Sequence, residues 1–169
     1  MILRCTHRFF KELSLSRLEI TNFMGEIHPL DEWYAHIFFI CRRKCVMFMN
    51  AKTRFSFVAI DVTRQQLKSL EDMFRKGLSK ALYEEDYSAE TIKMFNDRIG
   101  TLQFALTTDR SVLGSMNQFI MDFSYMYTRE DRKYDDAELG RQLRRTPVIK
   151  YGFPDRKMEE LLALHSVGK

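Results

Sequence analysis

Three short apolar segments follow one another between residues 35 and 60, and they limit the fold more than any other feature of the sequence. They cover residues 35–41, 45–50 and 55–60, and short polar stretches separate them. Apolar runs of this length between polar breaks predict β-strands, and three in succession predict a β-meander. In the first two runs both alternating faces are apolar, which is typical of strands covered on both sides. We therefore expect the meander to form the centre of a sheet.

Helical spacing replaces strand alternation after the meander. Thr63 and Gln66 are placed as a capping box, and Val62 and Leu67 are placed as its hydrophobic staple. The apolar positions that follow recur every three or four residues. This pattern predicts one amphipathic helix over residues 63–83 that packs on the meander.

Residues with the short polar side chains preferred at helix N-caps precede further helical patterns. The helical pattern that begins near residue 109 continues to about Tyr127. A later helical pattern, which begins at Asp135, ends before Pro147. The expected caps are Ser88, either Asp109 or Ser111, Asp135 and, for a last helix, Asp155.

Shorter patterns complete the expected order of elements. Residues 2–5 predict a strand and residues 7–13 a short helix, while residues 14–32 have no clean period and are interpreted as an ordered loop. Residues 102–107 alternate as a strand with one face in water, and residues 148–153 are a further candidate strand.

The length of the chain agrees with one domain. A domain of about this size buries roughly 70% of the surface that its unfolded chain exposes, and Gly and Pro are scattered singly instead of forming a linker. The sequence therefore predicts a single α+β domain over residues 1–169. Its core would be an antiparallel β-sheet, built on the β-meander, with helices packed on it.

No segment has the features of an export signal or of a membrane helix. Charge at Arg4, Arg8 and Lys11 interrupts the N-terminus before a signal-peptide apolar region can form. The longest apolar run, residues 37–41, is far shorter than the ~20 residues that a membrane helix requires. We expect a cytoplasmic protein that does not contact a membrane.

Cysteines and histidines are the residue types that a metal site or a general base would use. Cys5, Cys41 and Cys45 lie in or beside strand patterns, where cysteine acts as a small apolar residue, and no second Cys pair completes a zinc motif. We expect reduced thiols, no metal and no cofactor. The candidate general bases are His7, His28, His36 and His165.

Two short basic clusters stand out in a chain whose net charge is +4 and whose pI is near 9.0. Such a bias permits contact with nucleic acid or an acidic protein without demanding either. The clusters are interpreted either as solvated turns and helix faces or as surfaces that neutralise phosphates. The first consists of Arg42, Arg43 and Lys44, and the second of Arg141, Arg144, Arg145 and Lys150.

The most distinctive stretch, residues 107–117, runs from a strand into a helix start. Free backbone N–H groups at a helix start bind anions, and nearby Arg and Ser side chains can add donors to a phosphate or carboxylate. The spacing matches neither a Walker loop nor a dinucleotide fingerprint. Its small polar residues also let a helix approach a neighbour closely, so the stretch is either a ligand site or a packing element. The candidate residues are Arg110, Ser111, Ser115 and Asn117.

Several sequence elements spread along the chain form a characteristic set. They are ILRCT at 2–6, WYA at 33–35, RRK at 42–44, FMNAKT at 48–53, TDRSVLGSMN at 108–117, TP at 146–147 and YGFP at 151–154. Together they resemble a bacterial family of stand-alone domains of unknown function. The resemblance implies a single-domain protein from a bacterial or phage-related source, and it implies no activity. Residues 129–145 fit it least.

Two functional hypotheses follow from these patterns. The first is a non-catalytic binding module that recognises nucleic acid or a protein partner through residues 42–44 and the helix start at 110–117. The second is a small metal-independent nuclease or toxin-like enzyme that acts on RNA with the same surface and a histidine. A histidine or carboxylate within hydrogen-bond reach of Arg110 or Ser111, in an open cleft, would favour the enzyme.

Overall fold

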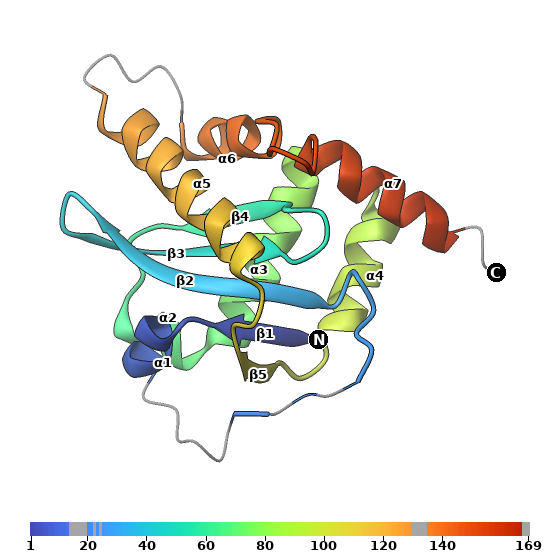
Figure 1. The fold of residues 1–169 in the computed structure, drawn as a ribbon, viewed down its shortest axis with the longest axis horizontal. Helices are drawn as coiled ribbons and strands as arrows, with labels where there is room; N and C mark the ends of the chain where they lie inside the picture. Colours follow the sequence, from blue (N-terminus) through green and yellow to red (C-terminus); the bar gives the residue numbers. More distant parts are fainter. Residues whose placement is uncertain (14–19, 22, 24, 130–134, 167–169) are drawn as a thin grey trace.

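One five-stranded sheet forms the centre of the protein. The computed structural model describes the whole chain except residues 14–19, 22, 24, 130–134 and 167–169 (Figure 1). The order of the strands across the sheet is β4-β3-β2-β1-β5. The strands are β1 (Ile2–Cys5), β2 (Glu32–Ile40), β3 (Arg43–Asn50), β4 (Ser56–Ala59) and β5 (Gln103–Leu106).

The sheet combines an antiparallel meander with two parallel pairings. β2, β3 and β4 pair in antiparallel register, so the predicted β-meander and the α+β class are confirmed. β1 lies between β2 and β5 and runs parallel to both, which the sequence did not predict. Parallel neighbours need a connection of a dozen or more residues. The segment between β1 and β2 provides one such connection, and β5 reaches the other side of β1 only after the meander and helices α2, α3 and α4.

Helices cover both faces of the sheet, which explains why both faces of β2 and β3 are apolar. α5 crosses in front of the sheet in Figure 1 with α6 beside it, and their buried residues form one core cluster with Met47 and Met49. The helices on the opposite face form a second core cluster with Phe48 and Phe57. The helices are α1 (His7–Leu13), α2 (Arg64–Lys68), α3 (Leu70–Glu84), α4 (Ala89–Ile99), α5 (Arg110–Thr128), α6 (Asp136–Arg144) and α7 (Pro154–Ser166).

An aromatic group fills the core between the sheet and α3. Phe74 of α3 packs edge-on against Trp33, with ring centroids 5.4 Å apart, and against Phe48, at 5.3 Å. Phe48 stacks on Phe57 of the neighbouring strand at 4.9 Å. The indole N–H of Trp33 donates to the carbonyl oxygen of Leu30, so the buried ring leaves no polar group unpaired.

The helix starts expected at Thr63, Ser88, Asp109 and Asp135 are confirmed, but Asp155 does not cap the last helix, because α7 begins at Pro154 and Asp155 lies in its first turn. Thr63 and Gln66 form the capping box, but the helix that was predicted over residues 63–83 breaks at Ser69 into α2 and α3. α2 packs on α1, whereas α3 packs on β4 and α4, and the break lets each helix follow its own neighbour. The N-caps of α4, α5 and α6 are Ser88, Asp109 and Asp135.

Two further expectations about strands are wrong. Residues 148–153 form a turn with an isolated bridge between Val148 and Gly152, and positive φ angles at Lys150 and Gly152 prevent a regular strand. The strand expected over residues 102–107 is present as β5, but the face assignment is wrong, because Ala105 is buried and Leu106 is exposed. Alternation alone does not tell which residues the neighbouring elements cover. Of the loop expected over residues 14–32, residues 14–19, 22 and 24 lie outside the described residues; the described part has no helix, and its only strand-type features are the isolated bridge at Ile20 and the start of β2 at Glu32.

No helix in the described ranges has the length and apolar character that crossing a bilayer demands.

Candidate functional site

A tight turn between β3 and β4 directs one arginine into the interior. Asn50 is fully buried, and its side-chain carbonyl accepts the backbone N–H groups of Lys52 and Thr53 and the Thr53 hydroxyl. The turn places Arg54 at φ +65°, a conformation that few residues other than glycine adopt. The turn therefore fixes the backbone of Arg54.

The Arg54 side chain lies beneath the first turn of α5. Its Nη2 donates to Ser111 Oγ across 3.3 Å, and its guanidinium centre lies 4.0 Å from the centroid of the Tyr151 ring. The hydroxyls of Ser111 and Tyr151 are 2.7 Å apart. Three segments far apart in the sequence therefore meet at one buried positive charge. We call Arg54, Ser111 and Tyr151 the Arg54 site.

The start of α5 contains one residue with a packing role and three exposed residues that could contact a ligand, the two alternatives that the sequence left open. Asp109 accepts the backbone N–H groups of Ser111 and Val112, so part of the helix terminus is already paired. Ser115 is buried and donates to the carbonyl oxygen of Ser111, which is a packing role. Arg110, Ser111 and Asn117 are exposed.

The second basic cluster belongs mostly to an ion-pair network. Arg144 is 1% exposed and donates to Glu85 across 2.7 Å and to Glu84 across 3.0 Å. Arg145 also pairs with Glu85, at 3.2 Å. Arg141 donates to the Glu84 carbonyl oxygen at 2.9 Å. These contacts join α6 to the end of α3, and they occupy charges that the sequence offered for phosphate binding.

A buried tyrosine lies near the same network. Burial raises the pKa of Tyr87, and the carboxylates of Glu159, Glu85 and Asp155 raise it further. Its hydroxyl has no hydrogen-bond partner among the described residues. A phenol in these surroundings stays protonated.

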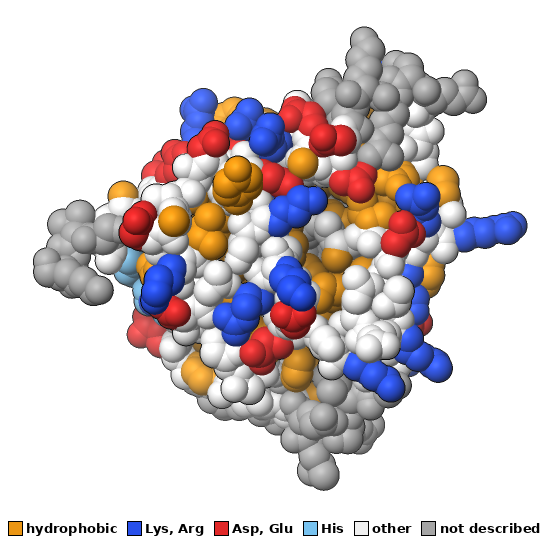
Figure 2. All heavy atoms as spheres, turned by 180° about the vertical axis from the view of Figure 1, so that it is seen from behind, with side chains coloured by type: hydrophobic (Ala, Val, Ile, Leu, Met, Phe, Trp, Pro, Cys, Tyr) orange, Lys and Arg blue, Asp and Glu red, His pale blue; other side chains and the backbone are white. Residues whose placement is uncertain are grey.

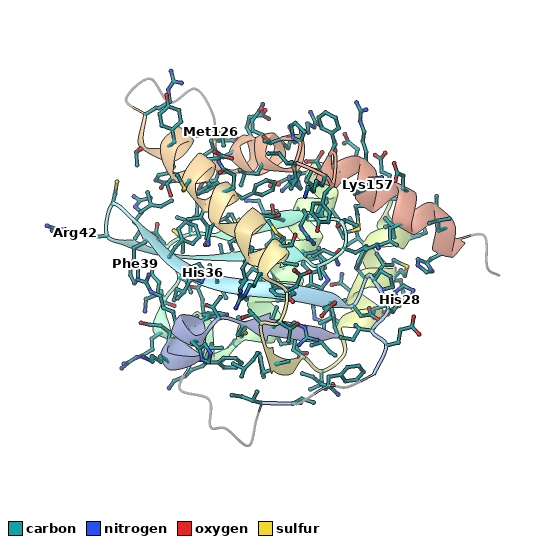
Figure 3. The ribbon with its side chains drawn as sticks, viewed as in Figure 1. His28, His36, Phe39, Arg42, Met126 and Lys157 are labelled. Carbon is teal, nitrogen blue, oxygen red and sulfur yellow. The ribbon has the colours of Figure 1, made fainter. Side chains whose placement is uncertain are left out.

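The first basic cluster lies at the tip of the β2–β3 hairpin. Cys41 and Arg42 form its two-residue turn, and both have positive φ angles. Figure 3 shows Arg42 at the tip, pointing away from the rest of the protein. Arg43 donates to the Tyr127 hydroxyl across 2.6 Å and pairs with Asp61 across 3.4 Å. Lys44 pairs with Glu12 of α1 across 2.6 Å.

Helices α1 and α2 add further basic residues beside this hairpin. The pKa of Glu12 is lowered, first by its hydrogen bond to Lys44 and then by the charges of Lys44, Arg8 and Arg64, so these cations lie close together. Figure 2 shows basic side chains along its right-hand edge, the side on which α1, α2 and the hairpin lie. The hairpin patch consists of Arg8, Lys11, Arg42, Arg43, Lys44, Arg64 and Lys68.

α5 separates the two candidate regions. Ser111 of the Arg54 site is in its first turn, and Tyr127, which contacts Arg43, is in its last. At 1.5 Å per residue these positions are about 24 Å apart along the helix. The sequence analysis expected residues 42–44 and the helix start at 110–117 to form one binding surface, but the structure places them in separate regions.

None of the described histidines forms a hydrogen bond with Arg110 or Ser111. His36 is paired with Thr6 at 2.9 Å, and His28 with His165 at 3.3 Å near the end of α7. Burial lowers the pKa of His28 and of His36. The carboxylate within reach of Ser111 is that of Asp109, which caps the helix.

The cysteines do not come together. Cys5 and Cys45 are buried in two different core clusters, and Cys41 is exposed at the hairpin turn. Within the described ranges no group of three or more Cys, His, Asp or Glu side chains is placed to hold a metal ion.

A cavity of about 400 Å³ opens beside β4, one of the two edge strands of the sheet. Lys76, Lys80 and Arg144 contribute positive charges to its lining. Each of them already pairs with a carboxylate, those of Asp72, Glu84 and Glu85 among them. The charges of this wall are therefore largely balanced.

The fold and these sites define an α+β domain with a mixed five-stranded sheet, a basic hairpin edge and a buried arginine beneath one helix. The chain belongs to the family described as "Domain of unknown function (DUF6933)", whose family model matches residues 2–157. This match confirms the expected membership of a family of unknown function. A search of curated proteins returned no match.

Sequence reasoning missed two members of the Arg54 site. Of the three residues, only Ser111 was among the candidate site residues expected from the sequence; Arg54 and Tyr151 were not. The one available signal was the FMNAKTRF segment, in which an arginine directly follows the polar turn before an apolar strand.

Proposed function

We propose that the protein is a non-catalytic binding module that recognises single-stranded nucleic acid through the hairpin patch. The observation that carries this proposal is the charge of the patch. Seven Lys and Arg side chains gather there beside two carboxylates, those of Glu12 and Asp61. A surface of this kind attracts a polyanion and neutralises its phosphates.

An exposed aromatic ring supports nucleic acid as the polyanion. Phe39 of β2 is 46% exposed, and the guanidinium of Arg8 lies 5.3 Å from its ring centroid. Aromatic side chains bordered by basic ones stack unpaired bases while the cations hold the backbone. The patch therefore fits a single strand better than a duplex, whose bases are already stacked.

Fluorescence anisotropy with labelled single-stranded RNA and DNA tests the proposal at low salt. The variant Arg42→Ala/Lys11→Ala/Arg64→Ala removes three exposed cations that have no ion pair among the described residues. Each phosphate contact contributes a slope of about −0.7 in log K against log salt for single strands. The triple variant should therefore bind more weakly and have a slope that is shallower by roughly 2.

A matched control separates the patch from net charge. The variant Lys76→Ala/Lys93→Ala/Lys157→Ala removes the same charge from three other helix positions, and its binding should change little. Phe39→Ala should weaken binding about tenfold or more without changing the salt slope, because stacking releases no counterions. Absence of binding to RNA and DNA by the wild type at low salt would reject nucleic acid and leave a protein partner.

A further inference from the structure

We propose that the Arg54 site binds a phosphate group. Arg54 is 1% exposed, and its Nε and Nη1 have no hydrogen-bond partner among the residues that the structure describes. The remaining nitrogen, Nη2, donates to the hydroxyl of Ser111. The site therefore contains a buried positive charge whose remaining N–H donors are unused.

The other buried arginines show what a balanced arrangement looks like in this protein. Arg144 is as buried as Arg54, and it pairs with Glu84 and Glu85 while Nη1 donates to the carbonyl oxygen of Ser56. Arg4 is 8% exposed and pairs with Glu32. No described carboxylate forms an ion pair with Arg54. Arg144 and Arg4 are thus buried with carboxylate partners, whereas Arg54 is buried without one in the described part of the chain.

An anion would complete this arrangement. Burial removes the hydration of the guanidinium, and the Tyr151 ring with one serine hydroxyl replaces only part of it. The first turn of α5 adds a favourable dipole for negative charge, although Asp109 already takes the N–H groups of Ser111 and Val112. The charge of Arg54 is therefore the main attraction.

The directions and number of donors favour phosphate over a carboxylate. One edge of the Arg54 guanidinium, formed by Nη2 with either Nε or Nη1, and the Ser111 hydroxyl can donate from different directions, and a phosphate presents oxygens in several directions. Three exposed cations stand one or two residues from members of the site, and none has an ion pair within the described ranges. They are Lys52, Arg110 and Lys150.

Access requires movement of one side chain. Ser111 is exposed, so the hydroxyl end of the site already faces solvent. Tyr151 covers the guanidinium from the turn at residues 148–152, where Ile149 is 86% exposed. Once the Tyr151 ring moves aside, a phosphate that takes the place of the Tyr151 hydroxyl as the partner of Ser111 can also accept from one edge of the Arg54 guanidinium.

The test compares melting temperatures with inorganic phosphate and with acetate at equal ionic strength. Inorganic phosphate at about 100 times its Kd should raise the melting temperature of the wild type by roughly 5–10 °C, and acetate should raise it much less. Arg54→Met should abolish the phosphate response. Ser111→Ala should weaken phosphate binding about tenfold, because one hydrogen bond to a charged group is lost. Lys93→Ala, in α4 and outside both candidate sites, is the control and should respond as the wild type does.

Several outcomes would overturn the site. These are a wild type that does not respond to phosphate, an equal response to acetate, and an Arg54→Met variant that responds as the wild type does. If Arg54→Met does not fold, Ser111→Ala decides, and unchanged phosphate affinity rejects the site. A nucleoside monophosphate that binds as tightly as inorganic phosphate would assign the site to the phosphate of a larger ligand, and much weaker binding would assign it to the free ion. Because the hairpin patch lies about 24 Å away along α5, this proposal and the nucleic-acid proposal can fail separately.

Discussion

Arg144 donates from Nε to the carboxylate of Glu85 across 2.7 Å, and both side chains are buried. This ion pair joins α6 to the residue that follows α3. Because Glu84 accepts from the same guanidinium, removal of the arginine would leave two largely buried carboxylates without their main partner. The relationship therefore predicts a large effect on stability.

Arg144→Met should lower the free energy of unfolding by about 3–5 kcal/mol, the usual cost of breaking a buried ion pair from one side. Urea unfolding measures this change. Arg145→Ala is the control, because Arg145 is about half exposed and shares Glu85, and such pairs contribute at most ~1 kcal/mol. A cost below about 1 kcal/mol for Arg144→Met would mean that the network does not hold the two helices together.

Two helical glycines provide a matched pair. A Cβ at position 77 would lie 2.5 Å from the Phe57 ring, whereas one at position 114 would meet nothing within 4 Å. Gly114→Ala should stabilise the protein by about 0.5–1 kcal/mol, because alanine is the better helix former. Gly77→Ala should destabilise it, since overpacking costs typically 1–3 kcal/mol. Thermal and urea unfolding of both variants would show opposite signs, and equal signs would contradict the close packing of α3 on β4.

Stability should fall at mildly acidic pH because of two histidines. Burial is the largest cause that lowers the pKa of His28 and of His36 in the fold, so folding favours their neutral forms. Their contribution is complete above the unfolded pKa of about 6.5 and is lost as the pH falls through the lower folded pKa. Urea unfolding at pH 7.5 and 5.5 measures the loss. His28→Gln/His36→Gln should have a smaller difference between the two conditions, and an unchanged difference would assign the effect to other groups.

Thiol reactivity should follow burial. Burial raises the pKa of Cys5, and it raises the pKa of Cys45 to about 11, so neither forms a thiolate readily in the fold. Cys41 is exposed. An aromatic disulfide reagent at pH 8 should modify one thiol rapidly and all three after unfolding, and Cys41→Ser should remove the rapid phase. Addition of a chelator should leave the melting temperature unchanged, because we expect no structural metal, and a large drop would contradict this.

The local patterns of the sequence predicted most of the elements. The capping residues Thr63, Ser88 and Asp109 start helices where they were expected, because a cap depends on bonds to residues two or three positions away. The break at Ser69 was missed, because it depends on what α2 and α3 pack against. The parallel position of β1 was missed for a similar reason, since strand order depends on partners distant in the chain.

Charge patterns located the basic residues but not their partners. The sequence presented residues 42–44 and residues 141–150 as equivalent clusters. The structure pairs Arg144 with Glu84 and Glu85, far away in sequence, and leaves Arg42 in solvent. Whether an arginine is a surface charge or a buried ion pair depends on which carboxylate the fold brings within 4 Å, and spacing along the chain carries no such information.

The sequence by itself determined the β-meander, the amphipathic helices and the α+β class, because these follow from hydrophobic periodicity and from caps that act within one helical turn. The tertiary structure decided which polar residues meet. Arg54, Ser111 and Tyr151 belong to a turn, a helix start and a second turn, and they converge because α5 packs across β2 and β3 of the meander. A buried charge and its donors are a property of that packing, which no local pattern encodes.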